Sequence, residues 1–198
     1  MTLQQYTQNV LAGEHLLFND MLVAAELLFN EETPADDIAS FLVALTQKGE
    51  TAHEVAALAT VMKSYALPVD APAGIYIDNC GTGGDGLDTF NISTTSAFVL
   101  AGGGIPIAKH GNRKISSKSG SSDVLEALGI HTFATVEETL TLLEQEGIAF
   151  LYAPSVHPKL KRLGEIRRAI GKPTIFNLVG PLTNPVPLKT QFVGINRP

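Results

Sequence analysis

The sequence contains a single cysteine, Cys80, so no disulfide can form within the chain, as is typical of proteins from a reducing compartment. It has no run of about 18 uninterrupted apolar residues, which argues against a membrane-spanning helix. The N-terminal stretch MTLQQYTQNV has no basic cluster followed by an apolar segment, so a secretory leader is not predicted. We therefore expect a cytoplasmic protein in which Cys80 packs in the interior and is not a reactive thiol.

Positive charge is scarce in residues 1–108, which hold only Lys48 and Lys63 against 13 acidic residues, for a net charge of -11. Residues 109–198 instead hold 12 lysines and arginines against 7 acidic residues, for a net charge of +5. The overall charge of -6 disfavours nucleic-acid binding, although a basic segment confined to one half can attract a small polyanion. The 44% of hydrophobic residues is sufficient for a folded globular protein with a substantial core.

The first third of the sequence has the apolar periodicity and end signals of short helices. Thr33 and Pro34 predict the N-cap and first turn of one helix, and Thr51 with Glu54 predicts a capping box at the start of the next. Because a few short helices bury little apolar surface, we expect them to pack against the rest of the chain or a second copy. We assign residues 1–70 to a small all-helical domain.

After the hinge-like linker VDAPAG at 69–74, short apolar strands alternate with helices. Strands are predicted at 75–80, 105–109 and 148–153, with helices between them. Such alternation is typical of parallel strands joined by right-handed crossovers. The predicted fold class is therefore α/β, with a small all-helical N-terminal domain and a mostly parallel α/β domain over 71–198.

The stretch DNCGTGGDGLDTFNIST places Gly81, Gly83 and Gly86 in the spacing G-x-G-x-x-G of dinucleotide-binding proteins. In those proteins the helix begins inside the motif, and an acidic residue follows about 20 positions later. Here LDTFN intervenes before any helix, and the next strand ends at Lys109 and His110, so a nicotinamide cofactor is not predicted. A Walker-type loop is also excluded, because no Lys-Ser or Lys-Thr pair follows the glycines.

The glycine-rich loop instead predicts a phosphate cradle. Closely spaced glycines let several backbone N–H groups converge on an anion, and a helix starting near Asn91, Ser93 and Thr94 adds positive charge at its N-terminus. Asp85 among the glycines indicates that the ligand also brings a divalent cation or sugar hydroxyls. The alternative is a turn used only for tight packing, with Ser93 as an ordinary helix cap.

A second candidate segment is KHGNRKISSKSGSSD, which directly follows a predicted strand. Within ten residues it holds four cations and no acid: Lys109, Arg113, Lys114 and Lys118. Its serines around Gly120 predict a second helix N-terminus that binds an anion, close to the first because adjacent parallel strands lie about 5 Å apart. A solvated surface loop is the alternative, and a metal site on His110 is not predicted because the other histidines lack ligand spacing.

A third segment runs from 157 to 185 and carries six cations and one acid between 159 and 172. Arg167 or Arg168 can hold a carboxylate in a bidentate manner, as lysine cannot, although ordinary helix surface charge is the alternative. The apolar, turn-rich stretch from Phe176 onward suits the wall of an aromatic pocket, or simply closes a loop.

Three motifs in this order, GTGGDGLDTFNIST, KHGNRKISSKSGSSDVLEALG and RRAIGKPTIFNLVGPLTNP, resemble the anthranilate phosphoribosyltransferases of tryptophan biosynthesis. The resemblance implies a pentosyl glycosyltransferase of the nucleoside phosphorylase/phosphoribosyltransferase type. Such an enzyme transfers the phosphoribosyl group from phosphoribosyl pyrophosphate to anthranilate, with Mg²⁺ as cofactor. The resemblance also implies a homodimer formed through the N-terminal helices, with small-molecule substrates and neither a membrane nor a nucleic-acid partner. The related pyrimidine nucleoside phosphorylases lack the KHGNR string.

Matched by position, the resemblance implies a phosphoribosyl pyrophosphate site made of Gly81, Gly84, Asp85, Thr89, Asn91, Ile92, Ser93, Thr94, Lys109, Ser117 and Ser121. Ser93 is also the expected metal ligand. The expected anthranilate contacts are Gly81, His110, Gly111, Asn112 and Arg167. No catalytic acid or base is assigned, because the departing pyrophosphate leaves an oxocarbenium-like sugar that the neutral arylamine attacks directly.

In the family an adjacent Asp-Glu pair binds magnesium in a stretch that would follow residue 198. The chain thus resembles the N-terminal portion of a family member. We expect an incomplete sheet with an unpaired edge, weak phosphoribosyl pyrophosphate binding, and negligible catalysis by residues 1–198 alone. The competing hypotheses are a non-catalytic module that binds nucleic acid or another polyanion, and a dimerisation fragment.

Overall fold

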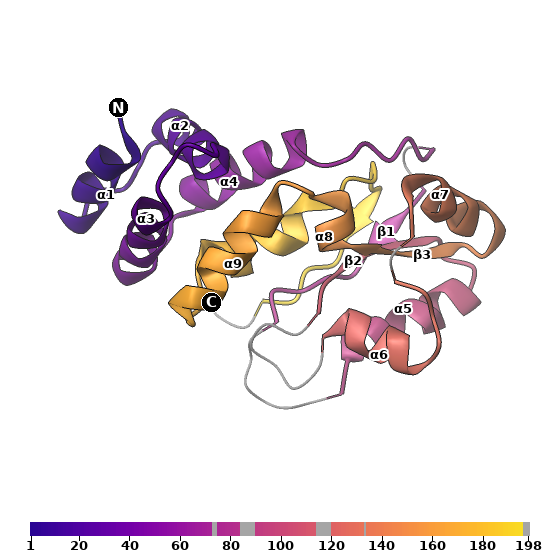
Figure 1. Cartoon of the computed structure of the whole chain (residues 1–198). Coiled ribbons are helices and arrows are strands. Elements are labelled where there is room, and N and C mark those ends of the chain that lie inside the picture. The colour runs from indigo at the N-terminus through magenta and orange to yellow at the C-terminus, as the bar shows by residue number, and fades with distance from the viewer. Residues whose placement is uncertain (73–74, 84–89, 114–119, 133, 196–198) are drawn as a thin grey trace. The chain divides into compact units, whose positions relative to one another are not determined.

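The computed structural model describes residues 1–72, 75–83, 90–113, 120–132 and 134–195. The chain forms two compact units (Figure 1). The helical unit comprises Met1–Tyr65 and Lys159–Thr183, and the sheet unit comprises Ala66–Pro158 and Asn184–Pro198. An all-helical part and a parallel α/β part were both predicted from the sequence, and both are confirmed.

The helical unit contains six α-helices and one 3-10 helix among the described residues: α1 (Leu3–Leu11), α2 (Phe18–Phe29), α3 (Ala35–Lys48), α4 (Ala52–Ser64), α9 (Leu160–Ile170), α10 (Ile175–Val179) and η1 (Gly180–Thr183). The predicted capping box at the start of α4 is present, because Thr51 accepts from the Glu54 N–H and Glu54 accepts from the Thr51 N–H. The predicted N-cap at Thr33 is wrong. Pro34 takes the cap position of α3 without a side-chain hydrogen bond, since the helix starts one residue later.

The core of the helical unit extends beyond the first 70 residues. Phe41 and Leu45 of α3 belong to the same buried cluster as Leu163 of α9 and Phe176 of α10. The unit therefore does not coincide with the predicted range 1–70, because 159–183 supply helices that cover the apolar stripes of the first four. This matches the expectation that short helices need apolar surface from elsewhere.

The sheet unit is built on a parallel sheet with the strand order β3-β2-β1-β4. Its strands are β1 (Ile77–Asp78), β2 (Ile107–Gly111), β3 (Ile148–Tyr152) and β4 (Thr190–Gln191). Its helices are α5 (Ile92–Gly102), α6 (Ser121–Ala127), α7 (Val136–Gln145) and α8 (Ala153–Val156). The loops after β1 and β2 leave the same edge of the sheet, because these two neighbouring strands are parallel.

Alternating residues of β3 pack against helices on opposite faces of the sheet. Phe150 contacts Phe98 of α5, with ring centroids 5.3 Å apart, whereas Leu151 shares a buried cluster with Leu143 of α7. Figure 1 shows α5 and α7 on the two sides of the strands. Val69 of the predicted hinge-like linker is buried in the α7-side cluster, so this part of the linker is a packed component of the sheet unit.

Candidate functional site

Asp78 lies at the end of β1 and is fully buried. Its carboxylate accepts hydrogen bonds from the backbone N–H groups of Cys80 (2.9 Å) and His110 (3.2 Å) and from Nδ2 of Asn184 (3.0 Å). Burial raises the pKa of Asp78, whereas these hydrogen bonds and the charge of Lys109 act in the opposite direction. Asp78 thus connects the ends of β1 and β2 with the segment that follows η1.

Lys109 in β2 is only 1% exposed, which makes it the largest buried cation in the described chain. Its ammonium donates one hydrogen bond, to Oδ1 of Asn79 at 3.1 Å. Burial lowers the pKa of Lys109, while the nearby carboxylate of Asp78 opposes this effect. An ammonium has three donors, so a buried lysine with one acceptor is suited to binding an anion. The alternative of a solvated basic loop does not apply to this residue.

The N-cap and first turn of α5 supply further polar side chains at this end of the sheet. Asn91 is the N-cap residue, and Ser93 and Thr94 lie in the turn that follows. The Thr94 side chain is 2% exposed, and its hydroxyl has no hydrogen-bond partner among the described residues. An unpaired buried hydroxyl at a helix N-terminus is well placed to donate to a phosphate oxygen.

The loops after β1 and β2 are held together at their far ends. Nδ2 of Asn91 donates to the carbonyl oxygen of Gly120 at 3.1 Å. The described ends of the glycine-rich segment and of the basic segment therefore meet in one place.

The N-terminus of α6, where the sequence predicts a second anion site, has an acidic side chain of its own. The carboxylate of Asp123 already accepts from the Gly120 N–H at 2.7 Å and puts negative charge at this helix start. The Ser121 hydroxyl is engaged with the backbone N–H and carbonyl of Asn112, each at 3.1 Å. Ser121 packs directly over Gly111, where a Cβ atom would collide with the serine side chain.

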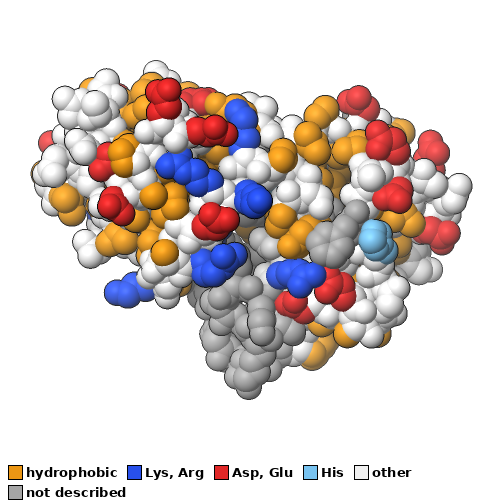
Figure 2. All heavy atoms as spheres, in the orientation of Figure 1, with side chains coloured by type: hydrophobic (Ala, Val, Ile, Leu, Met, Phe, Trp, Pro, Cys, Tyr) orange, Lys and Arg blue, Asp and Glu red, His pale blue; other side chains and the backbone are white. Residues whose placement is uncertain are grey.

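Arg113 of the basic segment also does not contribute free charge. Its guanidinium forms an exposed ion pair with Glu126 of α6 at 2.5 Å. His110 is buried and contacts the ring of His157, with centroids 5.4 Å apart. On the face shown in Figure 2, cationic side chains lie at the surface among acidic and apolar ones, so exposed charge alone marks no site there.

The described part of the glycine loop approaches the segment after β4. The Thr82 N–H donates to the carbonyl oxygen of Gly194 at 2.9 Å, and a Cβ on Gly81 would lie 2.9 Å from the same oxygen. Gly83 has φ +63°, which favours glycine. Four predicted site residues lie outside the described residues: Gly84, Asp85, Thr89 and Ser117.

Arg167 belongs to α9 in the helical unit, whereas the other predicted site residues belong to the sheet unit. Its Nη2 donates to Oδ1 of Asn177 at 3.2 Å, and its guanidinium carbon lies 5.1 Å from the centroid of the Phe176 ring. Burial lowers the pKa of Arg167 to about 10. Within the described residues it forms no ion pair, so this half-buried cation suits an incoming carboxylate.

Sequence reasoning missed Asp78, Asn79 and Asn184 as parts of this site. Each carried a signal, because Asp78 and Asn79 directly precede the glycine loop and Asn184 lies in the GPLTNP motif. Cys80, which was expected to pack in the interior, is only half-buried, and desolvation of its thiol raises its pKa to about 12.

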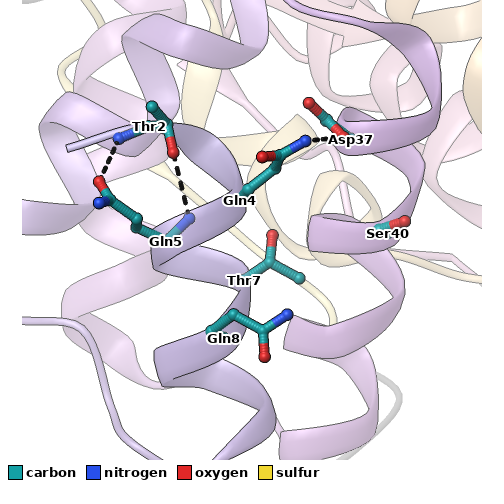
Figure 3. A pocket seen from close by; sticks show the side chains of 7 residues that line it. All are labelled: Thr2, Gln4, Gln5, Thr7, Gln8, Asp37 and Ser40. Atoms are coloured by element: carbon teal, nitrogen blue, oxygen red, sulfur yellow. Dashed lines mark hydrogen bonds between the residues drawn. The ribbon is translucent and has the colours of Figure 1, made fainter.

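Other features of the described chain offer less chemistry. A hollow of about 580 Å³ between α1 and α3 is lined by polar side chains, among them Gln4, whose amide donates to Asp37 at 3.1 Å (Figure 3). It contains no cation. The described residues hold no group of three or more histidine, cysteine, aspartate or glutamate side chains able to bind a metal ion. Nor does any helix among them combine the length and apolarity needed to cross a bilayer.

Comparisons with known proteins match both units. Residues 73–198 match the family model described as glycosyl transferase family, a/b domain, and residues 4–66 match its helical bundle domain. An anthranilate phosphoribosyltransferase from Exiguobacterium sibiricum is 57% identical over 185 residues, which cover 93% of this chain and 55% of that protein. The chain therefore spans little more than half the length of this curated relative.

Two solved structures are also similar. The anthranilate phosphoribosyltransferase from Thermus thermophilus matches with a TM-score of 0.88 and 38% identity, covering 97% of this chain and 58% of that one. The Saccharomyces cerevisiae enzyme in complex with PRPP and Mg matches with a TM-score of 0.85 and 31% identity, covering 98% of this chain and 58% of that one.

Proposed function

Because this chain belongs to the glycosyl transferase family whose a/b and helical bundle domains it matches, we propose that it is an anthranilate phosphoribosyltransferase. The reaction transfers the phosphoribosyl group from phosphoribosyl pyrophosphate to anthranilate, giving phosphoribosylanthranilate and pyrophosphate in tryptophan biosynthesis. The observation that most supports this proposal is the buried ammonium of Lys109 beside the first turn of α5, at the meeting point of the glycine-rich and basic segments. The relatives described above are named anthranilate phosphoribosyltransferases.

The phosphoribosyl pyrophosphate site is proposed to include Gly81, Gly84, Asp85, Thr89, Asn91, Ile92, Ser93, Thr94, Lys109, Ser117 and Ser121. In this site the Lys109 ammonium and the N–H groups of the first α5 turn attract the phosphate oxygens, and Thr94 donates its unpaired hydroxyl. Ser121 takes part by holding the Asn112 backbone, since its hydroxyl is occupied there.

In the reaction, the bond from the sugar C1 to the pyrophosphate oxygen breaks, and its electron pair leaves with the pyrophosphate. The lone pair of the anthranilate nitrogen forms the new C–N bond, and that nitrogen then loses a proton. Negative charge grows on the leaving pyrophosphate in the transition state, so Lys109 and the α5 N-terminus stabilise that state more than the ground state. No residue of the chain is needed as a strong base, because the arylamine attacks in its neutral form.

Anthranilate is proposed to bind through Arg167, with His110, Gly111, Asn112 and Gly81 as further contacts. The half-buried guanidinium of Arg167 has no acidic partner among the described residues and is oriented by Asn177, which suits bidentate binding of the substrate carboxylate.

Magnesium is proposed as the cofactor, with Ser93 as the one ligand assigned to it within the described residues. The Ser93 hydroxyl makes no hydrogen bond among those residues and is therefore available as an oxygen ligand. A single hydroxyl matches an ion that keeps several waters and is carried mainly by substrate phosphates. Ser93 would hold the ion, and a magnesium ion bound there would supply charge neutralisation for the pyrophosphate leaving group.

A homodimer and a cytoplasmic location complete the proposal. The helical unit exposes apolar side chains of the kind that a second copy covers, including Leu17 (72% exposed) and Val23 (48% exposed). A single cysteine, which cannot form an internal disulfide, fits a reducing compartment.

The test is calorimetric titration with phosphoribosyl pyrophosphate, with and without magnesium, for the wild type, Lys109→Met and Ser93→Ala. Lys189→Met, which removes an exposed lysine of the same unit, is the matched control. We expect binding that requires magnesium, competes with pyrophosphate and is lost in Lys109→Met, with Ser93→Ala affected only when magnesium is present. Wild-type binding of nucleic acid with a steep salt dependence, but not of phosphoribosyl pyrophosphate, would overturn the proposal in favour of a polyanion-binding module.

A further inference from the structure

Asn79 joins two elements of the site through a single carboxamide. It directly follows β1 and is 6% exposed. Its Nδ2 donates to the carbonyl oxygen of Ser93 at 2.8 Å and to the hydroxyl of Ser96 at 3.0 Å, both in α5. Its Oδ1 accepts from the Lys109 ammonium at 3.1 Å. One buried side chain therefore spans from β2 to the start of α5.

The chemistry of the partners fixes the orientation of this amide. A carbonyl oxygen only accepts and an ammonium only donates, so the NH₂ group must face Ser93 and the oxygen must face Lys109. Rotating the amide by half a turn would place two acceptors together on one side and two donors on the other. The observed arrangement is thus the only one in which all three contacts are satisfied.

A neutral amide oxygen holds the lysine without cancelling its charge. Among the described residues the carboxylate near Lys109 is that of Asp78, and it is already occupied by two backbone N–H groups and the amide of Asn184. Within the described residues Lys109 therefore keeps two donors for an incoming anion. The same carboxamide fixes the α5 turn that contains Ser93 and Thr94.

We propose that Asn79 is a positioning residue that sets the separation between the Lys109 ammonium and the first turn of α5, and thereby the affinity of the site for a pyrophosphate-bearing ligand. This inference rests on the proposed function, since it assigns a further residue to the same site. Asn79 acts through Lys109 and α5, and it need not touch the ligand.

The test compares wild type with Asn79→Ala and Asn79→Asp, using magnesium pyrophosphate, phosphoribosyl pyrophosphate and anthranilate as separate probes in calorimetry. Because a displacement of about 1 Å in a positioned group can cost about 100-fold, we expect Asn79→Ala to weaken binding of both pyrophosphate compounds by about 10- to 100-fold. The aspartate in Asn79→Asp has the same size as asparagine, but it donates no hydrogen bond to α5 and adds a negative charge that pairs with Lys109. We therefore expect Asn79→Asp to lose more affinity for both pyrophosphate compounds than Asn79→Ala does. Anthranilate affinity should stay within about twofold, which a general loss of structure would not allow.

Leu143→Ala is the matched control, because it removes a buried side chain of the same unit away from the site and should lower the melting temperature without changing either affinity. Folded Asn79 variants that bind pyrophosphate within about twofold of wild type, or a control that loses affinity as they do, would refute the inference. If the wild type binds pyrophosphate but not phosphoribosyl pyrophosphate, the proposed function is refuted. The titrations with pyrophosphate would then still decide the role of Asn79. Binding of neither compound by the wild type would remove both.

Discussion

Replacing Arg167 by methionine is expected to stabilise the protein and to weaken anthranilate binding. Burial lowers the pKa of Arg167 to about 10, more than two pKa units below its ordinary value. At about 1.36 kcal/mol per pKa unit, the charged guanidinium costs the folded state about 3 kcal/mol. The hydrogen bond to Asn177 and the contact with the Phe176 ring return about 1–2 kcal/mol, so Arg167→Met should gain about 1–2 kcal/mol.

The same substitution removes the proposed partner of the substrate carboxylate. Truncating one member of a desolvated charge pair typically costs about 2–5 kcal/mol, which corresponds to a loss of affinity from about 30-fold to several thousandfold. For a chain of this length the gain in stability should raise the melting temperature by about 2–8 °C. Thermal denaturation followed by circular dichroism measures the first effect, and titration with anthranilate measures the second. Arg168→Met, at the exposed neighbouring position, should change neither quantity.

The pH dependence of the unfolding free energy tests the same reasoning, because the direction of the change with pH is fixed by the pKa shift of Arg167. Because the folded-state pKa of Arg167 is lower than in the unfolded chain, the unfolded state binds more protons above pH 10, and stability rises with pH there. The difference in unfolding free energy between wild type and Arg167→Met should therefore shrink as the pH rises through about 10. A variant that melts below wild type at neutral pH, or that still binds anthranilate normally, would show that Arg167 has a structural role instead.

Three other substitutions or treatments have defined outcomes. Glu54→Gln should lower the unfolding free energy by about 3–5 kcal/mol, because it leaves Lys48 buried without its charge partner. Hydrogen bonds outweigh burial and lower the pKa of Glu54, so melting curves of wild type and variant should converge as the pH falls below the ordinary carboxyl range. Gly81→Ala places a Cβ 2.9 Å from a backbone oxygen and should cost about 1–3 kcal/mol in denaturant unfolding, whereas Gly102→Ala in open space should cost nothing. With a pKa of about 12, Cys80 should react with a thiol reagent at neutral pH only after unfolding, so rapid labelling of the native protein would contradict its packing role.

The local signals in the sequence predict the elements of the fold well because they act over three or four residues. The capping box at Thr51 is found as expected, and Gly49 takes the C-cap position of α3. Thr33 is an exception, since Pro34 occupies the cap position that the threonine was expected to fill. The parallel pairing of β1 with β2 also follows from the strand–helix–strand order of the sequence.

Which segments form each unit was harder to predict from the sequence, because it depends on contacts between distant segments. The helix that contains Leu163 follows the α/β pattern in the sequence but packs with the N-terminal helices. Its apolar stripe alone does not specify which surface it will cover. The same limit applies to the N-terminus of α6. The Asp123 carboxylate accepts from the Gly120 N–H only in a particular side-chain rotamer. A sequence rich in serine and glycine does not predict that rotamer.

The polar groups that organise the site act through contacts between segments far apart in the sequence, and Asn184 of the GPLTNP motif illustrates the physical reason. The chain leaves the sheet unit after Pro158 and returns to it at Asn184, whose amide donates to Asp78 at 3.0 Å and to the carbonyl oxygen of Ala108 at 2.8 Å. Its own Oδ1 accepts from the Val186 N–H at 3.0 Å. A buried carboxylate between two strands is costly unless its oxygens are satisfied, so the ends of β1 and β2 are fully stabilised only after this returning segment has folded against them. The ends of β1 and β2 are therefore near one another because of strand pairing, but their detailed geometry depends on a residue more than 70 positions further along the chain.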